Sequence, residues 1–202
     1  MEQSKILSLS EAIMGRIFVP LEASGRHVHL TKEQCFALFG QELAPDRPLS
    51  QPEQFLSKQR VRIIGPKGQI DHVAVLGPAR SQAQVEISMT DSRVLGINAP
   101  VRQSGDVENT PGIIVEGPRG RIGLQSGVII AQRHLHLTPE AATLFSVKDK
   151  QVVQLQTYTS RPTRFQEVVV RVSSEFSNAA HLDFDEANAC GMHSGDLGRI
   201  VI

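Results

Sequence analysis

Three sequence blocks occur twice in this chain, in the same order, and this duplication limits the folds available to it. "RHVHLT" at residues 26–31 returns as "RHLHLT" at 133–138. "VEISMTDSRVLGI" at 85–97 aligns with "AHLDFDEANACGM" at 180–192, and the tripeptide "SGD" follows each of these blocks. A repeated order of blocks indicates a duplicated unit, with each copy about the size of one small domain.

Local signals predict short helices and many strands within each copy. Thr31 heads a capping box with Gln34, and Thr138 precedes a proline, which suits the first position of a helix. A helix is also predicted in each "VEIS"-type block, with N-cap and C-cap at Thr90 and Gly96, and at Asp185 and Gly191. Most other segments are Val- and Ile-rich runs of strand length. The sequence predicts a mainly β fold, in which the duplicated unit forms two small β-barrel domains with short capping α-helices.

The domain limits follow from the repeat. Residues 1–16 have apolar side chains at helical spacing and are expected to form a leader helix. The first β-barrel repeat is placed at 17–125, and the second at 126–202, where the N-terminal strand is a candidate to complete it. Residues 41–59 are rich in turn-forming residues and are expected to form a connecting loop.

Charge and composition exclude several classes of protein. Lys+Arg and Asp+Glu both number 21, so the formal net charge is zero, and neither nucleic acid nor a membrane is an expected partner. No apolar run approaches the roughly 20 residues of a membrane span, and the N-terminus lacks a signal-peptide pattern. Cys35 and Cys190 are too few for a disulfide framework. We therefore expect a cytoplasmic protein with reduced thiols.

The paired histidines predict metal ligands. Alternate residues of a strand point to the same side, about 7 Å apart, so both imidazoles of a His-x-His pair can face one ion. A single such pair is most often just two histidines on one face of a strand. Here the pair is duplicated in register, and the repeat supplies a third ligand for each copy. The candidate ligand sets are His27, His29 and Glu86, and His134, His136 and His181.

Three protein ligands leave an open coordination position, which is typical of catalytic rather than structural zinc. Imidazole and carboxylate ligands favour zinc and also accept other divalent first-row metals. His72 and His193 have no matching partners in the repeat and are expected to be surface or hydrogen-bonded residues. Cys35 and Cys190 are expected in the core, without a role as nucleophile.

Three arginines lie close to these candidate ligands in the sequence. Arg80 precedes Glu86 by six residues, and its guanidinium could clamp a phosphate or a developing oxyanion if the segment folds back over the ion. A solvated turn residue is the simpler interpretation. Arg26 and Arg133 precede the two His-x-His pairs, and they are either structural partners within the repeat or anion binders.

Five stretches together resemble the PduL-type phosphate propanoyltransferases, the phosphotransacylases of bacterial microcompartments. They are "GRHVHLT", "GPARSQAQVEISMTD", "QSGD…TPGI", "IIAQRHLHLTPE" and "HLDFDEANACG", in the family's order from about residue 18 to the C-terminus. The resemblance implies an enzyme that interconverts acyl-CoA plus phosphate and acyl phosphate plus free CoA, with a propanoyl or acetyl group. It also implies a homo-oligomer inside a bacterial microcompartment, with two Zn²⁺ per chain at a dinuclear site between two β-barrels.

The resemblance also assigns roles to single residues. It makes His27, His29 and Glu86 the ligands of one ion, and His134, His136 and His181 those of the other. Arg80 falls on the family's catalytic arginine, and Ser24, Leu76 and Asn188 match positions that face coenzyme A. This chain departs from the family's pattern at three positions: Gly25, where Asn is frequent, Ala74, where Arg is frequent, and Phe184, where Thr is usual.

Two other functions fit the same residues. A dinuclear zinc hydrolase would use metal-bound hydroxide on an ester or phosphoester. A non-catalytic shell or scaffold component would be recruited through the leader at 1–16. That leader resembles the encapsulation peptides that carry enzymes into microcompartments, so shell proteins or core enzymes are candidate partners even if the chain is catalytic.

Overall fold

The computed structural model describes residues 14, 15 and 17–202. It divides into two compact units. The first-repeat unit comprises residues 24–132 and 183–185. The second-repeat unit comprises residues 133–182 and 186–202 together with the described residues before Ser24. The limits expected from the sequence, 17–125 and 126–202, stay a prediction. So does the leader helix at 1–16, which lies outside the described residues except for Met14 and Gly15.

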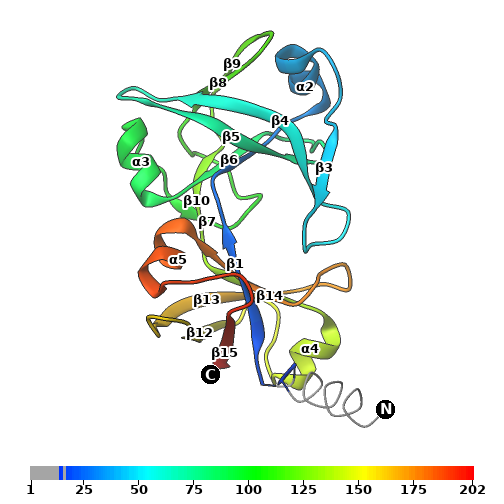
Figure 1. Cartoon of the computed structure of the whole chain (residues 1–202), viewed down its shortest axis with the longest axis vertical. Coiled ribbons are helices and arrows are strands. Elements are labelled where there is room, and N and C mark those ends of the chain that lie inside the picture. The colour runs from blue at the N-terminus through cyan, green and yellow to red at the C-terminus, as the bar shows by residue number, and fades with distance from the viewer. Residues whose placement is uncertain (1–13, 16) are drawn as a thin grey trace. The chain divides into compact units, whose positions relative to one another are not determined.

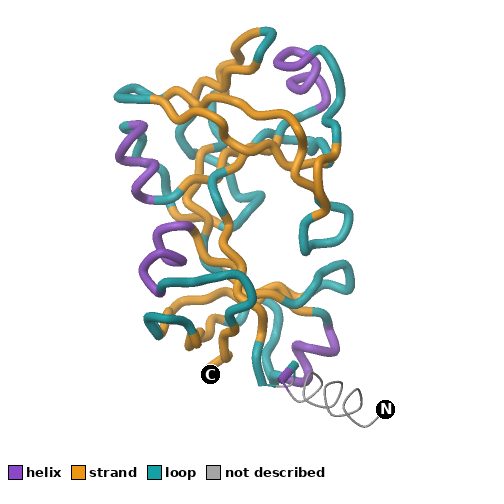
Figure 2. Tube along the Cα trace, in the orientation of Figure 1, coloured by secondary structure: helices purple, strands orange, loops and turns teal. Residues whose placement is uncertain are grey.

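The first-repeat unit is a curled sheet of nine strands with two helices (Figures 1 and 2). The strand order is β7-β10-β6-β2-β5-β4-β8-β9, and β3 pairs with β4 alone. The elements are β2 (His27–His29), α2 (Lys32–Phe39), β3 (Pro45–Pro48), β4 (Phe55–Ile64), β5 (Gln69–Gly77), β6 (Gln84–Ile87), α3 (Met89–Leu95), β7 (Val101–Arg102), β8 (Ile113–Gly117), β9 (Gly120–Leu124) and β10 (Val128–Ala131).

The second-repeat unit is a closed barrel of six strands in the order β1-β14-β11-β13-β12-β15. The chain's first described strand, β1, pairs with its last strand, β15, and this pairing helps to close the barrel. The elements are β1 (Val19–Ser24), β11 (His134–Leu137), α4 (Pro139–Leu144), β12 (Val152–Tyr158), β13 (Arg164–Val172), β14 (Ala179–Asp183), α5 (Phe184–Cys190) and β15 (Leu197–Val201).

The mainly β, duplicated fold predicted from the sequence is confirmed. In the first repeat, β2 is parallel to β5 and antiparallel to β6. In the second, β11 is parallel to β13 and antiparallel to β14. The copies also match in backbone detail, because the aligned residues His72 and Glu167 both adopt a left-handed conformation, with φ of 56° and 54°. Two non-glycine residues rarely share this conformation by chance.

The prediction of a loop over residues 41–59 is wrong. Residues Pro45–Pro48 form β3, and β4 begins at Phe55. The prolines at 45 and 48 favoured a turn in the sequence, but β3 pairs on one side only. Proline is tolerated in such an edge strand, because its missing N–H is not needed for pairing.

Helix ends follow the predicted chemistry except at two N-caps, Thr90 and Asp185. Asp185 lies inside α5, which begins at Phe184, and is therefore not its N-cap. Thr31 and Gln34 form the capping box of α2, and Thr138 caps α4 ahead of its proline. Thr90 is not the N-cap of α3: Ser88 is, in a capping box with Asp91. The alignment favoured Thr90 because it matched Asp185, and Thr and Asp are both common N-cap residues. Only the backbone shows where the first helical hydrogen bond forms.

Each unit has its own buried core. In the first-repeat unit the core includes Val28, Leu30, Ile63 and Val85, and in the second it includes Leu135, Leu155 and Leu182. Val28 and Leu135 each lie between the two histidines of a His-x-His pair and point to the opposite side of the strand. Core packing therefore sets the rotation of both histidine strands. Within the described part of the chain, no helix is long and apolar enough to cross a membrane.

Candidate metal centres

The first candidate centre lies on neighbouring strands of the first-repeat unit. His27 and Glu86 are directly opposite each other in the antiparallel pair β2 and β6, and His29 follows on the same side of β2. All three residues are buried, with 3% to 7% of their surface exposed. One ligand atom from each lies within 4.8 Å of the others. Glu86 Oε1 is 3.5 Å from His27 Nε2.

The second candidate centre repeats this arrangement in the barrel. His134 and His181 are opposite each other in the antiparallel pair β11 and β14, and His136 follows on β11. Their ring centroids are 4.7 to 5.0 Å apart, and their ligand nitrogens also lie within 4.8 Å of one another. In both copies the third residue is thus the cross-strand neighbour of the first histidine.

Neighbouring groups set which imidazole nitrogen faces each centre. His27 Nδ1 is 2.7 Å from the Gly25 carbonyl, so this nitrogen carries the proton and donates it, and Nε2 faces Glu86. The Glu22 carboxylate lies 3.8 Å from His181 Nδ1 in the second centre. A carboxylate or carbonyl behind a ligating histidine is the usual way in which proteins orient the ring towards a metal.

The donor atoms fit a divalent metal ion. The sets are two nitrogens with one carboxylate, and three nitrogens, which are both known for catalytic zinc. In the first centre His29 Nδ1 is buried and has no hydrogen-bond partner among the described residues. A buried polar atom of this kind is costly unless another group, such as an ion, satisfies it.

The first centre holds its histidines in different electrostatic environments. Burial lowers the pKa of His27, but the Glu86 carboxylate and hydrogen bonds to Glu86 and Gly25 more than offset this, so the pKa lies above its ordinary value. Burial lowers the pKa of His29 most, and the charges of His27 and Arg80 lower it further, so it lies well below its ordinary value. His29 is therefore held neutral, which is the form that binds metal.

A polar chain connects Arg80 with Glu86. The Arg80 guanidinium donates to Ser104 Oγ at 3.3 Å, and Gln84 Nε2 donates to the same oxygen at 2.9 Å. Gln84 Nε2 also donates to Glu86 Oε1 at 2.5 Å. The Arg80 backbone N–H donates to the Leu30 carbonyl at 2.9 Å. The segment thus folds back beside the histidine strand, and its charge lowers the pKa of both histidines there.

Arg26 and Arg133 are structural partners within the repeat. Arg26 Nε donates to the buried Asp91 carboxylate of α3 at 2.9 Å. Arg133 donates to Glu186 of α5 at 2.8 Å. The two acids are equivalent positions of the repeat. Each pair ties a histidine strand to the helix that follows the third ligand.

The residues expected at coenzyme A do not form one cluster within either unit. Ser24 and Leu76 belong to the first-repeat unit and are half-buried, whereas Asn188 is exposed on α5 in the second-repeat unit. The backbone of Leu76 raises the pKa of the His29 ring, which places this residue beside the first centre.

The two cysteines and the two remaining histidines belong to neither candidate cluster. Cys35 and Cys190 are buried as free thiols, and burial raises the pKa of each. His72 is exposed, and so is His193. These observations agree with the sequence-based assignment of core cysteines and surface histidines.

Sequence reasoning missed several residues that surround the centres. Gln84 and Ser104 had no assigned role, and Glu22 was not considered. Phe176 stacks on His136 with ring centroids 4.0 Å apart. Only Ser104 carried a signal, because it belongs to the repeated "SGD" tripeptide.

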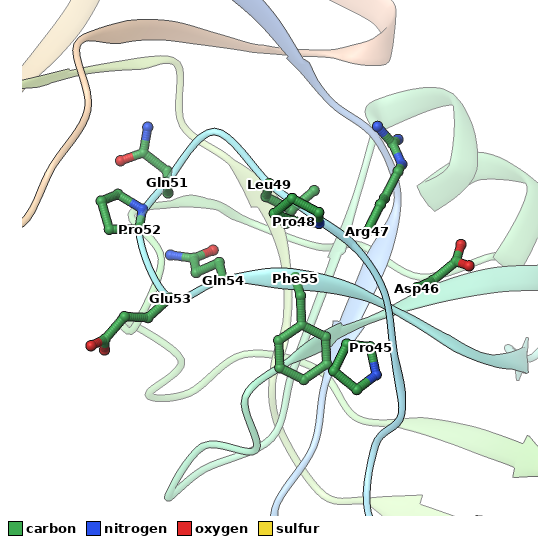
Figure 3. Close-up of a pocket in the computed structure, with 10 residues that line it drawn as sticks. All are labelled: Pro45, Asp46, Arg47, Pro48, Leu49, Gln51, Pro52, Glu53, Gln54 and Phe55. Carbon is green, nitrogen blue, oxygen red and sulfur yellow. The ribbon is translucent and has the colours of Figure 1, made fainter.

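A hollow of about 430 Å³ lies at the β3–β4 hairpin (Figure 3). Its walls come from one continuous segment between Pro45 and Phe55. None of the candidate ligands lines it, so the sequence-based site does not depend on it.

Together, the fold and the two clusters define a class: duplicated β proteins in which each repeat presents three metal-type ligands. The model of the phosphate propanoyltransferase family matches residues 20–193. The chain belongs to this family, and it is therefore an acyltransferase enzyme.

Curated relatives support this assignment over most of the chain. A phosphate propanoyltransferase of Enterococcus faecalis is 49% identical over 183 residues, covering 90% of this chain and 87% of the relative. One of Leptotrichia buccalis is 51% identical, covering 89% and 86%. One of Listeria monocytogenes is 46% identical, covering 100% of this chain and 97% of the relative.

Proposed function

We propose that this enzyme transfers an acyl group between coenzyme A and phosphate, with propanoyl or acetyl as the acyl group. In the forward direction, acyl-CoA and phosphate give acyl phosphate and free CoA. The observation that carries the proposal is the pair of three-ligand clusters at equivalent positions of the repeat, in a chain of the phosphate propanoyltransferase family.

We propose two Zn²⁺ per chain acting as a dinuclear centre. His27, His29 and Glu86 would hold one ion, and His134, His136 and His181 the other. Such ions supply Lewis-acid polarisation of phosphoryl and carbonyl oxygens and stabilise developing negative charge. The donor sets support zinc, and other divalent first-row metals are accepted by the same ligands.

The protein's own groups account for the remaining chemistry. A phosphate oxygen attacks the thioester carbonyl, the new C–O bond forms, and the C–S bond breaks with departure of the CoA thiolate. The Arg80 guanidinium stabilises the charge on the carbonyl oxygen and helps to orient phosphate. Ser104 and Gln84 hold Arg80 and Glu86 in position through the bonds described above. Direct attack needs no thiol nucleophile, in agreement with the buried cysteines.

Coenzyme A is the proposed second substrate. Ser24, Leu76 and Asn188 are proposed to contact it, and the position of Leu76 beside His29 supports this for the first-repeat unit. We also propose that the enzyme assembles as a homo-oligomer and works inside a bacterial microcompartment. Residues 1–16 are proposed as the segment that binds shell proteins or core enzymes, and deletion of this segment should abolish co-purification with shells.

The test is the release of free CoA thiol from acetyl-CoA and propanoyl-CoA, with and without phosphate, before and after chelation. Release that requires phosphate and disappears on chelation would support the proposal, and the ratio of the two rates would rank the substrates. Release without phosphate would instead indicate a zinc hydrolase. No release from a metal-loaded chain would indicate a binding or scaffold role.

A further inference from the structure

The ring of Phe184 occupies the space beside Gly25 where another residue would have its Cβ. A Cβ built on Gly25 would lie 2.5 Å from Phe184 Cζ, 3.0 Å from Cε1 and 3.1 Å from Cε2. Gly25 is not among the glycines with positive φ. A Cβ at position 25 would therefore have to displace the aromatic ring, whereas the backbone conformation does not itself require glycine.

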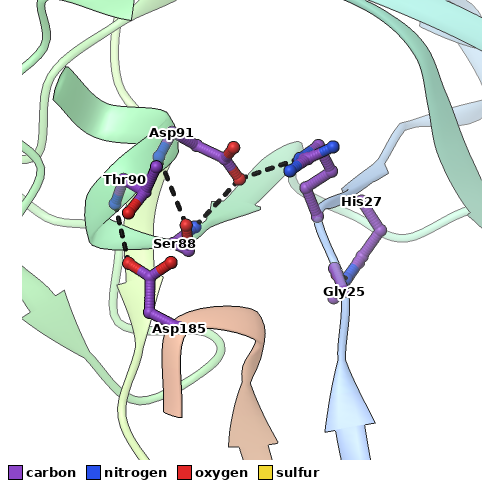
Figure 4. A network of polar contacts seen from close by, with 7 residues as sticks. Gly25, His27, Ser88, Thr90, Asp91 and Asp185 are labelled. Atoms are coloured by element: carbon purple, nitrogen blue, oxygen red, sulfur yellow. Dashed lines mark hydrogen bonds and ion pairs between the residues drawn. The ribbon is translucent and has the colours of Figure 1, made fainter. Parts of the chain in front are cut away.

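Gly25 is hydrogen-bonded to His27, a candidate ligand of the first centre. Its carbonyl oxygen accepts the hydrogen bond from His27 Nδ1 at 2.7 Å, and Figure 4 shows the His27 ring turned back towards Gly25. This bond fixes the ring so that Nε2 points to Glu86. A displacement of the Gly25 carbonyl would rotate the His27 ring, and a ligand that is rotated away from its best direction binds metal more weakly.

Phe184 is itself held from two sides. The next residue, Asp185, accepts a hydrogen bond from the Thr90 backbone N–H at 2.8 Å, which ties this segment to α3 (Figure 4). The Arg26 guanidinium carbon lies 5.8 Å from the Phe184 ring centroid, within the range of a cation–π contact. Arg26 is held in turn by the buried Asp91. The ring is fixed against Gly25 although 39% of Phe184 remains exposed.

We propose that Phe184 is a positioning residue for the first metal centre: its ring packs on Gly25 and thereby holds the carbonyl that orients His27. This inference rests on the proposed metal site. Phe184 acts on the centre through Gly25 and is not itself a ligand. A mere space-filling role would affect stability, whereas a positioning role also affects metal affinity.

The test is a cobalt(II) titration of the full chain against a competing chelator. The variants are Gly25→Ala, Phe184→Ala and the double variant, each also made with His136→Ala, which isolates the first centre. Phe36→Ala is the control, since Phe36 is another exposed phenylalanine of the same unit. Thermal unfolding of each metal-free variant measures stability separately from affinity.

Each single variant should weaken cobalt binding at the first centre about tenfold, as expected for a change behind a ligating histidine. The second centre and the Phe36→Ala control should keep the parent affinity. The double variant should bind no more weakly than Gly25→Ala alone, because the ring that the new Cβ would meet is then absent.

Two results would overturn the inference while leaving the proposed function intact. One is a Phe184→Ala variant that loses thermal stability but keeps its cobalt affinity within twofold. The other is a double variant whose loss equals the product of the two single losses. A parent chain that binds no cobalt at the first centre would overturn the proposed metal site, and with it the role of Phe184.

Discussion

Arg80 offers the sharpest test of how the first centre works. The Arg80 guanidinium donates a hydrogen bond to Ser104. The Arg80 backbone N–H donates to the carbonyl of Leu30, the residue after His29. Arg80→Ala removes the charged donor that is proposed to stabilise the developing oxyanion. Loss of one such donor typically lowers kcat about 10²–10³-fold, or about 3–4 kcal/mol of transition-state stabilisation.

Loss of the hydrogen bond between Arg80 and Ser104 should lower kcat by a smaller factor. Ser104→Ala keeps the Arg80 charge but removes its acceptor, and one hydrogen bond of this kind contributes about 1 kcal/mol. We therefore expect a roughly fivefold fall in kcat for Ser104→Ala. Arg80→Lys should fall between the two, because it keeps the charge without the planar guanidinium.

Metal binding in Arg80→Ala should depend on pH in a defined direction. The Arg80 charge lowers the pKa of His27 and His29, so its removal raises both. Protons then compete better with metal as the pH falls, because only neutral imidazole is a ligand. Competition with a chelator should show near-parent affinity at pH 8 and a weaker first centre at pH 6. Turnover within threefold of the parent would remove Arg80 from the mechanism.

Three further outcomes are expected. His29→Ala and His136→Ala should each lower bound metal from two ions to one per chain by elemental analysis, and a chain that keeps both ions would contradict the ligand assignment. Burial raises the pKa of the Cys35 and Cys190 thiols. A thiol reagent at pH 8 should therefore modify them only after denaturant is added, and rapid reaction of the native enzyme would refute this. His72→Gly should raise the free energy of unfolding by about 0.5–1 kcal/mol, because glycine adopts the left-handed conformation of residue 72 without strain. His72→Ala should give no such gain. Equal effects of the two substitutions would show that the backbone is not strained there.

Much of the fold and of both candidate clusters could be predicted from the sequence. The repeated order of blocks predicted a mainly β, duplicated chain, which the strand pairing confirms. The alignment placed Glu86 and His181 at one equivalent position, and each proves to be the cross-strand neighbour of a first histidine, His27 or His134. Patterns of period two and capping residues are local, so they are readable without knowing which strands meet.

Local signals also explain the errors. The prolines at 45 and 48 have the chemistry of a turn, and only the position of β3 at a sheet edge makes them acceptable in a strand. Thr90 has the hydroxyl of a capping residue, but Ser88 lies where the helix begins. The type of a residue limits the structural roles that it can take, and the fold decides which of these roles it has.

The sequence by itself determined the duplication, the two sets of metal-type ligands and the ends of most helices. Only the tertiary structure decided what surrounds them. The sequence allowed Arg26 to be an anion binder or a structural partner, and the structure shows it paired with Asp91, 65 positions away. The contact of Phe184 with Gly25 has no local signature at all. The residues of each pair are far apart in the sequence and meet only when the first-repeat unit folds. No pattern of neighbouring residues along the chain predicts such contacts.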